Sequence, residues 1–71
     1  MLTLPRRAWV EFGKRVCGSW WLQVMVPTRA RAYPGGRMAH STYMGDSEAI
    51  VFAWAANHYG QTVLALPRKA K

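Results

Sequence analysis

The stretch "WWLQVMVPTRARAYPGGRMAHSTYM", residues 20–44, decides the fold. Residues 20–26 are rich in aromatic and β-branched side chains and are closed by a proline, which is typical of a β-strand. Residues 38–44 predict a second, weaker strand with fewer strand-forming residues. Because the connector between them contains two adjacent glycines, the stretch predicts a β-hairpin.

The connector of this hairpin, "PTRARAYPGGR" (residues 27–37), is longer and more basic than a turn requires. It carries no acid but three arginines and a tyrosine: Arg29, Arg31, Arg37 and Tyr33. In an extended segment Arg29, Arg31 and Tyr33 would point to the same side, because side chains alternate along an extended chain. Arginine suits phosphates and carboxylates, and tyrosine can stack on a base or fill a protein pocket. We therefore expect an electropositive finger that contacts an anionic partner.

Basic residues are concentrated in the first half of the chain and at its end. The formal net charge is +7, and residues 38–67 contain no Lys or Arg. Four further bases are expected to extend the charge of the finger: Arg6, Arg7, Lys14 and Arg15. Solubility alone does not require such segregation. The pattern therefore favours a nucleic acid, or an acidic or nucleic-acid-binding protein complex, as the partner.

Residues 1–18 form a basic segment that predicts a short helix. Pro5 suits the first position of a helix. Trp9, Phe12 and Val16 recur at the spacing of one apolar stripe. A glycine and a serine follow this stripe, and glycine is the usual residue just past the end of a helix.

Residues 45–60, "GDSEAIVFAWAANHYG", give the clearest helix. Asp46 or Ser47 can accept a hydrogen bond from the first free N–H groups, and Gly60 ends the pattern. Small side chains that let a helix lie close to a sheet line one narrow face: Ala49, Ala53 and Ala56. We therefore expect that face to pack on the sheet.

The opposite side of this helix is unusually apolar for a surface helix. It carries Val51, Ala55 and His58, with Trp54 at its border. Because monomers rarely leave a large apolar patch open, we expect this side to be a protein interface. A second copy of the chain or a partner would cover it.

Residues 61–67, "QTVLALP", predict a third strand, which a crossover connection places beside the first. The sequence thus predicts one α+β domain over 1–71, with an N-terminal helix, a core over 20–66, a basic tail over 67–71 and the element order αββαβ. Its sheet has three antiparallel strands in the order 2-1-3, and one helix packs on a face. The residues expected in the core are Trp20, Leu22, Val24, Ala53 and Leu64.

No catalytic site, metal site or cofactor is expected. Cys17, His40 and His58 stand 23 and 18 residues apart, which matches no zinc pattern. A nucleophilic triad needs a Ser or Cys, a His and an orienting acid. Two of the three acids are already accounted for at the start of the second helix, so the chain is not expected to be an enzyme.

The single cysteine excludes an internal disulfide and indicates a reducing, cytoplasmic compartment. The longest uncharged apolar run near the N-terminus, residues 16–26, is shorter than the about 20 residues that a membrane span needs. We therefore expect no contact with a membrane.

The hairpin, the segment "DSEAIVFAWAANHYG" (residues 46–60) and a short last strand together resemble the layout of small proteins encoded by phages and other mobile elements. Some anti-CRISPR proteins have this layout. The resemblance covers about residues 20–66 and implies a non-enzymatic binder. The N-terminal helix and the arginine-rich connector are additions to the layout, and the resemblance assigns no functional residue.

These observations favour a small, basic, non-catalytic binding protein. The expected target is a nucleic acid or a complex that binds nucleic acid, and the resemblance suggests a phage-type inhibitor of a CRISPR effector. The alternative is a small structural subunit of a large ribonucleoprotein or multi-protein assembly, whose basic arms enter RNA or acidic neighbours. A third interpretation is a protein-only module or homodimer that uses the outer side of the second helix.

Overall fold

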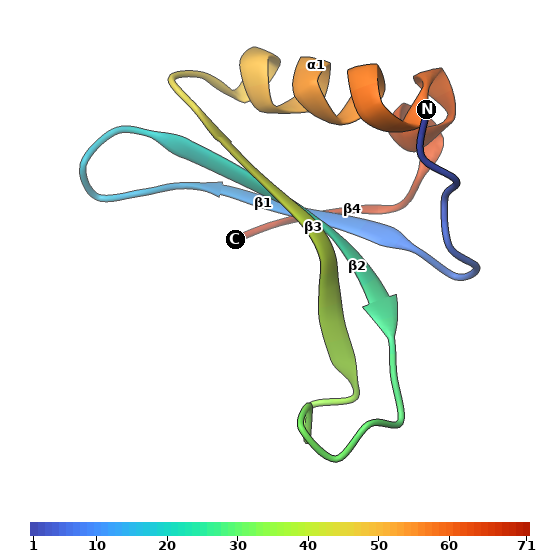
Figure 1. Cartoon of the computed structure of the whole chain (residues 1–71). Helices are drawn as coiled ribbons and strands as arrows, with labels where there is room; N and C mark the ends of the chain where they lie inside the picture. Colours follow the sequence, from blue (N-terminus) through green and yellow to red (C-terminus); the bar gives the residue numbers. More distant parts are fainter.

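The computed structural model describes all of residues 1–71 and has a four-stranded mixed sheet with one α-helix on one face (Figure 1). The elements are β1 (Trp9–Lys14), β2 (Trp20–Pro27), β3 (Arg37–Gly45), α1 (Glu48–Tyr59), the 3-10 helix η1 (Gln61–Ala65) and β4 (Arg68–Ala70). The strand order is β3-β2-β1-β4. Neighbouring strands are antiparallel except β1 and β4, which are parallel.

The hairpin predicted over residues 20–44 is confirmed by the antiparallel pair β2 and β3. Its connecting loop, residues 28–36, is called the hairpin tip below. In Figure 1 it lies at the end of the molecule farthest from α1. A β-bulge interrupts the pairing beside Val24 and Met25, because Val24 lies opposite Ser41 while Met25 lies opposite Ala39.

The fold class predicted from the sequence, a three-stranded antiparallel sheet in the order 2-1-3, is wrong at both ends of the chain. The first error is the N-terminal helix, because residues 9–14 form β1 and pair with β2. Val10 and Leu22 are fully buried on the helix side of the sheet, whereas Val16, counted in the helical stripe, is exposed. Gly18, which was predicted to end the helix, has φ of 96° and closes the turn between β1 and β2.

The second error is the strand predicted over residues 61–67. The position beside β2 is already taken by β1, and residues 61–65 continue from α1 as η1. Strand pairing resumes at Pro67, whose carbonyl accepts a hydrogen bond of 2.8 Å from the Val10 N–H group. The segment predicted as a basic tail is therefore the edge strand β4 followed by Lys71.

The helix α1 begins and ends as predicted but packs through the other side. The Ser47 hydroxyl accepts a hydrogen bond of 3.2 Å from the Ile50 N–H group, and Gly60, with φ of 86°, follows the last turn. The buried side chains of α1 are Val51, Phe52, Ala55 and Tyr59. Val51, Phe52 and Tyr59 bury more apolar area than the three alanines of the predicted face would. At twelve residues, α1 is too short to cross a membrane.

The core lies between α1 and the sheet. Its fully buried side chains are Val10, Leu22, Val24, Val51 and Val63. Of the residues predicted in the core, Leu22 and Val24 are confirmed, Trp20 and Leu64 are partly buried against the cluster, and Ala53 is exposed.

Candidate nucleic-acid interface

The face of the sheet opposite α1 is not covered by any other element (Figure 1). Because side chains alternate along each strand, the residues between the core positions point to this side. This surface, called the open face below, comprises Trp9, Glu11 and Gly13 of β1, Trp21, Gln23 and Met25 of β2, Arg37, Thr42 and Met44 of β3, Lys69 of β4, and the flanking Arg15 and Lys71. It combines two indoles with several cations.

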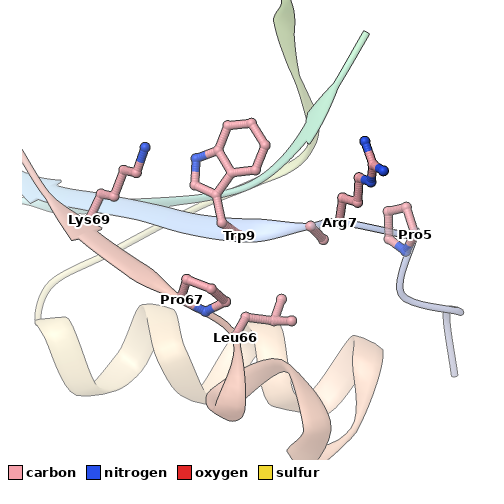
Figure 2. A pocket seen from close by; sticks show the side chains of 7 residues that line it. Pro5, Arg7, Trp9, Leu66, Pro67 and Lys69 are labelled. Carbon is pink, nitrogen blue, oxygen red and sulfur yellow. The ribbon is translucent and has the colours of Figure 1, made fainter.

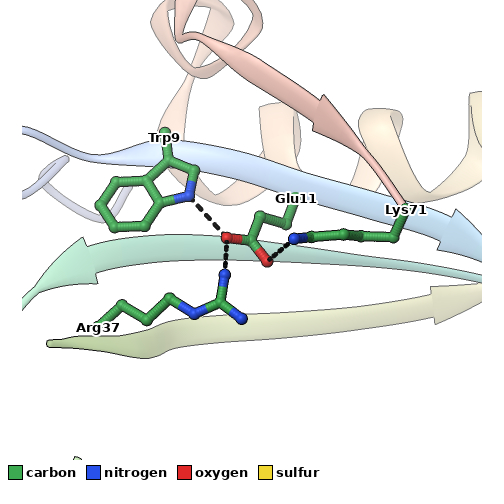
Figure 3. Close-up of polar contacts among 4 residues, drawn as sticks. All are labelled: Trp9, Glu11, Arg37 and Lys71. Carbon is green, nitrogen blue, oxygen red and sulfur yellow. Dashed lines mark hydrogen bonds and ion pairs between the residues drawn. The ribbon is translucent and has the colours of Figure 1, made fainter. Parts of the chain in front are cut away.

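A buried carboxylate organises the middle of the open face. Glu11 is 3% exposed, and its Oε2 atom accepts hydrogen bonds from Trp9 Nε1 at 2.8 Å and from Arg37 at 2.7 Å (Figure 3). Lys71 Nζ lies 3.6 Å from the Oε1 atom. These contacts orient the Trp9 indole and link β3 and the end of the chain to β1. Arg37 therefore belongs to the open face and not to the hairpin tip.

The same contacts set the ionisation of Glu11. Burial opposes ionisation and is the largest single influence on this carboxyl group. The hydrogen bond from Trp9 and the charges of Arg37 and Lys71 together outweigh burial and hold the pKa of Glu11 below its ordinary value. The carboxylate is consequently ionised and paired at neutral pH.

Because the folded protein binds the Glu11 proton less readily than the unfolded chain, its carboxylate stabilises the fold above the unfolded-state pKa of about 4.3. This contribution is lost as the pH falls through the lower, folded pKa. We expect Glu11→Gln to lower the free energy of unfolding by about 2 kcal/mol at neutral pH. We also expect it to flatten the decline in stability below about pH 4.5. Urea denaturation at a series of pH values measures both effects.

The control for this experiment is Asp46→Asn, which removes an exposed acid outside the open face. It should leave the acid-induced loss of stability close to that of the wild type. Equal pH dependence for Glu11→Gln and the wild type would contradict the assigned role of Glu11.

The Trp21 indole lies over Gly13 on the neighbouring strand. A Cβ atom placed on Gly13 would stand 3.1 Å from two atoms of the Trp21 ring and 3.2 Å from the Lys71 carbonyl oxygen. The absence of a side chain at Gly13 thus lets the ring lie close to the sheet. A shallow hollow at this end of the open face is lined by Trp21 together with Arg15, Gln23, Thr42 and Met44.

The other end of the open face has a second indole with cations around it. Figure 2 shows the side chains of Arg7, which precedes β1, Trp9 of β1 and Lys69 of β4 on the same side of the sheet, at the mouth of a hollow. The Lys69 Nζ atom lies 5.5 Å from the centroid of the Trp9 ring. Arg7 has φ of 61°, a left-handed conformation that costs a non-glycine residue about 1 kcal/mol. An arginine at this strained position places a cation beside Trp9.

The hairpin tip exposes Arg29, Arg31 and Tyr33, as predicted, but it is not an extended arm. The Tyr33 N–H group donates to the Ala30 carbonyl at 3.0 Å, and the Gly36 N–H group donates to the Tyr33 carbonyl at 2.9 Å. The tip is therefore folded into successive turns. The expected alignment of the three side chains along an extended segment is wrong.

The remaining predicted binding residues divide into two groups. Arg7, Arg15 and Arg37 come together on or beside the open face. Arg6 is exposed in the turn before β1, and Lys14 is exposed at the end of β1 opposite Trp20. These two lie outside the open face.

The predicted protein interface on α1 is wrong for two of its four residues. Val51 and Ala55 are fully buried against the sheet. The Nδ1 atom of His58 shares a hydrogen bond of 3.1 Å with the Tyr43 hydroxyl, and this bond holds the His58 ring against β3. Trp54, 49% exposed, remains on the outer side beside the exposed Ile50, and His58 is exposed as well.

The other histidine also has a structural contact. Because of the β-bulge, neighbouring residues of β3 both reach the Tyr59 hydroxyl: His40 Nδ1 at 2.6 Å and Ser41 Oγ at 2.7 Å. Burial raises the pKa of Tyr59 above its ordinary value. No three His, Cys, Asp or Glu side chains lie together in a cluster that could hold a metal ion.

Sequence reasoning missed Trp9, Glu11, Trp21, Lys69 and Lys71 as site residues. The signal for the first two was the alternation of apolar core residues with Trp9, Glu11 and Gly13 in "WVEFGK", which indicates a strand as well as a helix. No local pattern indicates that β4 lies beside β1, since that pairing spans most of the chain.

The chain matches no protein-family model, and no curated protein or solved structure is significantly similar to it. The geometry and chemistry of the open face are therefore what bears on function.

Proposed function

We propose that the protein is a non-catalytic nucleic-acid-binding protein that uses the open face of its sheet, assisted by the hairpin tip. One observation carries this proposal: two indoles and five cations gather on and beside a single uncovered sheet face. The cations are Arg7, Arg15, Arg37, Lys69 and Lys71. Cations neutralise phosphates, and indoles stack on bases.

The distribution of charge supports a nucleic acid over an apolar partner. Glu11 is the only acid on the open face, and its carboxylate is buried beneath its cationic partners. The side chains that reach solvent there are therefore aromatic, uncharged polar, apolar or positive. Arg29 and Arg31 add two exposed cations at the hairpin tip. An acidic protein surface would be attracted by the same charges, and the steeper salt dependence expected for a nucleic acid distinguishes the two.

The charge also bears on the inhibitor role suggested by the layout of the chain. A protein of formal net charge +7 is repelled by the basic groove in which a ribonucleoprotein holds its nucleic acid. An inhibitor with this surface acts by occupying or holding the nucleic acid itself. The proposal takes no support from the resemblance to anti-CRISPR proteins, because that resemblance assigns no functional residue.

The alternative, a structural subunit of a large ribonucleoprotein, is favoured by one further observation. Ile50, Ala53, Trp54 and Asn57 line a shallow, mainly apolar hollow on the outer side of α1, away from the open face. A subunit that touches RNA with one side and a protein neighbour with the other would have both surfaces. Such a subunit would aggregate unless it is co-expressed with its neighbours.

The proposal is tested by titrating the pure protein into fluorescently labelled oligonucleotides and following their anisotropy. Binding without any other component is the expected result. A folded, soluble protein that binds neither single strands nor duplexes at low salt would overturn the proposed function.

A further inference from the structure

We propose that the nucleic acid is single-stranded and lies across the open face, with one base on Trp9 and another on Trp21. This inference rests on the proposed function and specifies its ligand. It concerns two sites of the same kind, each made of an indole with cations beside it, at opposite ends of the open face.

The register of the sheet gives the spacing of the two sites. Trp9 pairs with Met25, and Met25 is four residues from Trp21 along β2. At about 3.4 Å per residue, the two indoles are anchored about 14 Å apart. Successive bases in a helical strand rise by only about 3.4 Å, so a strand that reaches both indoles needs several nucleotides.

Each indole is held in place by the sheet. The Trp9 ring is oriented by its hydrogen bond to the buried Glu11 carboxylate. The Trp21 ring lies over the bare backbone of Gly13. Rings that are already positioned lose little freedom when a base stacks on them, which favours binding.

The cations lie where the backbone of a stacked strand would pass. Lys69 and Arg7 flank Trp9, and Arg15 lines the hollow beside Trp21. Lys69 now lies over the Trp9 ring, an exposed cation–π contact that is weaker than a typical base–aromatic stack. An arriving base can therefore displace the ammonium group, which is then free to pair with a phosphate.

A duplex does not use these features. Its bases are paired and stacked and present only their edges in the grooves. The open face is part of a broad sheet, and the Trp21 indole lies over Gly13 instead of projecting from the sheet. A duplex could contact only the cations, and the two indoles would add nothing to its affinity.

The test compares a single strand of about eight nucleotides, within the range of known single-strand site sizes, with a duplex of the same length. Oligothymidylate and oligouridylate serve as the DNA and RNA single strands. The variants are Trp9→Leu and Trp21→Leu, and the matched control is Trp54→Leu on the outer side of α1. Each open-face variant should weaken single-strand binding by about 5- to 150-fold, whereas the control should not change it.

Trp9→Phe and Trp21→Phe should restore most of the affinity, because phenylalanine also offers a face for stacking. If a leucine variant does not fold, the wild type still decides the question. It should bind the single strand more tightly than the duplex and should bind a thymidine dinucleotide far more weakly than the longer strand.

Equal affinity of the wild type for single strand and duplex would overturn this inference. Unchanged single-strand binding by folded Trp9→Leu and Trp21→Leu variants would also overturn it. In both cases binding itself persists, so the proposed function would stand. Absence of binding to every oligonucleotide would overturn the inference and the proposed function together.

Discussion

Replacing Val24 with Asp is expected to unfold the protein. Val24 is fully buried in the middle of β2, between the sheet and α1. A carboxylate there has no partner, and burying it costs several kcal/mol. A domain of this size has a thin core and a total stability of about 5 kcal/mol. Circular dichroism during thermal unfolding should show no cooperative transition at neutral pH.

The matched control is Thr42→Asp, which introduces the same charge on the opposite face of the sheet. Thr42 is exposed on β3, so its replacement should change the stability by about 0.5 kcal/mol or less. A Val24→Asp variant that melts at the wild-type temperature would show that the faces of β2 are assigned wrongly.

Binding to a single strand is expected to weaken about a hundredfold when the salt concentration rises from about 50 to 200 mM. The estimate assumes about five phosphate contacts, supplied by cations of the open face and the hairpin tip. Each contact releases counterions and contributes about −0.7 to the slope of log K against log salt concentration. Anisotropy titrations at several salt concentrations measure this slope.

The contribution of the hairpin tip is separated by changing Arg29 and Arg31 to Ala together. Both side chains are exposed and outside the core, so the fold should remain intact. The slope should become less steep by about 1.4 units on a single strand. Arg29→Lys with Arg31→Lys is the control, because it keeps both charges and should keep the slope. A wild-type affinity that is insensitive to salt would exclude phosphate contacts as its source.

The parts of the fold that were predictable from the sequence are those with local signals. β2 ends at Pro27, and the two glycines mark the turn that leads to β3. The helix α1 begins with a capping serine and ends at Gly60. In each case neighbouring residues specify the structure, so no knowledge of distant contacts is needed.

The side of α1 that packs on the sheet was not predictable in the same way. Apolar residues surround this helix, with Ile50 and Trp54 on one side and Val51 and Phe52 on the other. A helix without a polar face gives no local preference for which side is buried. The side that is buried depends on the sheet, where Phe52 packs against Phe12 with ring centroids 5.2 Å apart.

The open face was not predictable because it depends on long-range pairing. It exists only if residues 9–14 form a strand and pair with β2 in the register that places Trp9 beside Met25. Lys69 and Lys71 join it only because β4 pairs with β1 from the other end of the chain. The segregation of basic residues favours an anionic partner, but on its own it predicts an interface at the hairpin tip and not on the sheet.

The central claim, that the open face is the nucleic-acid-binding surface, is tested most directly by following the four tryptophan indole N–H resonances during an NMR titration with a short oligothymidylate. The account predicts large shifts for Trp9 and Trp21 and for backbone amides of β1 and β4. Trp54, on the outer side of α1, should stay unchanged. Shifts confined to Trp54 and α1, with Trp9 and Trp21 unaffected at saturation, would contradict the account.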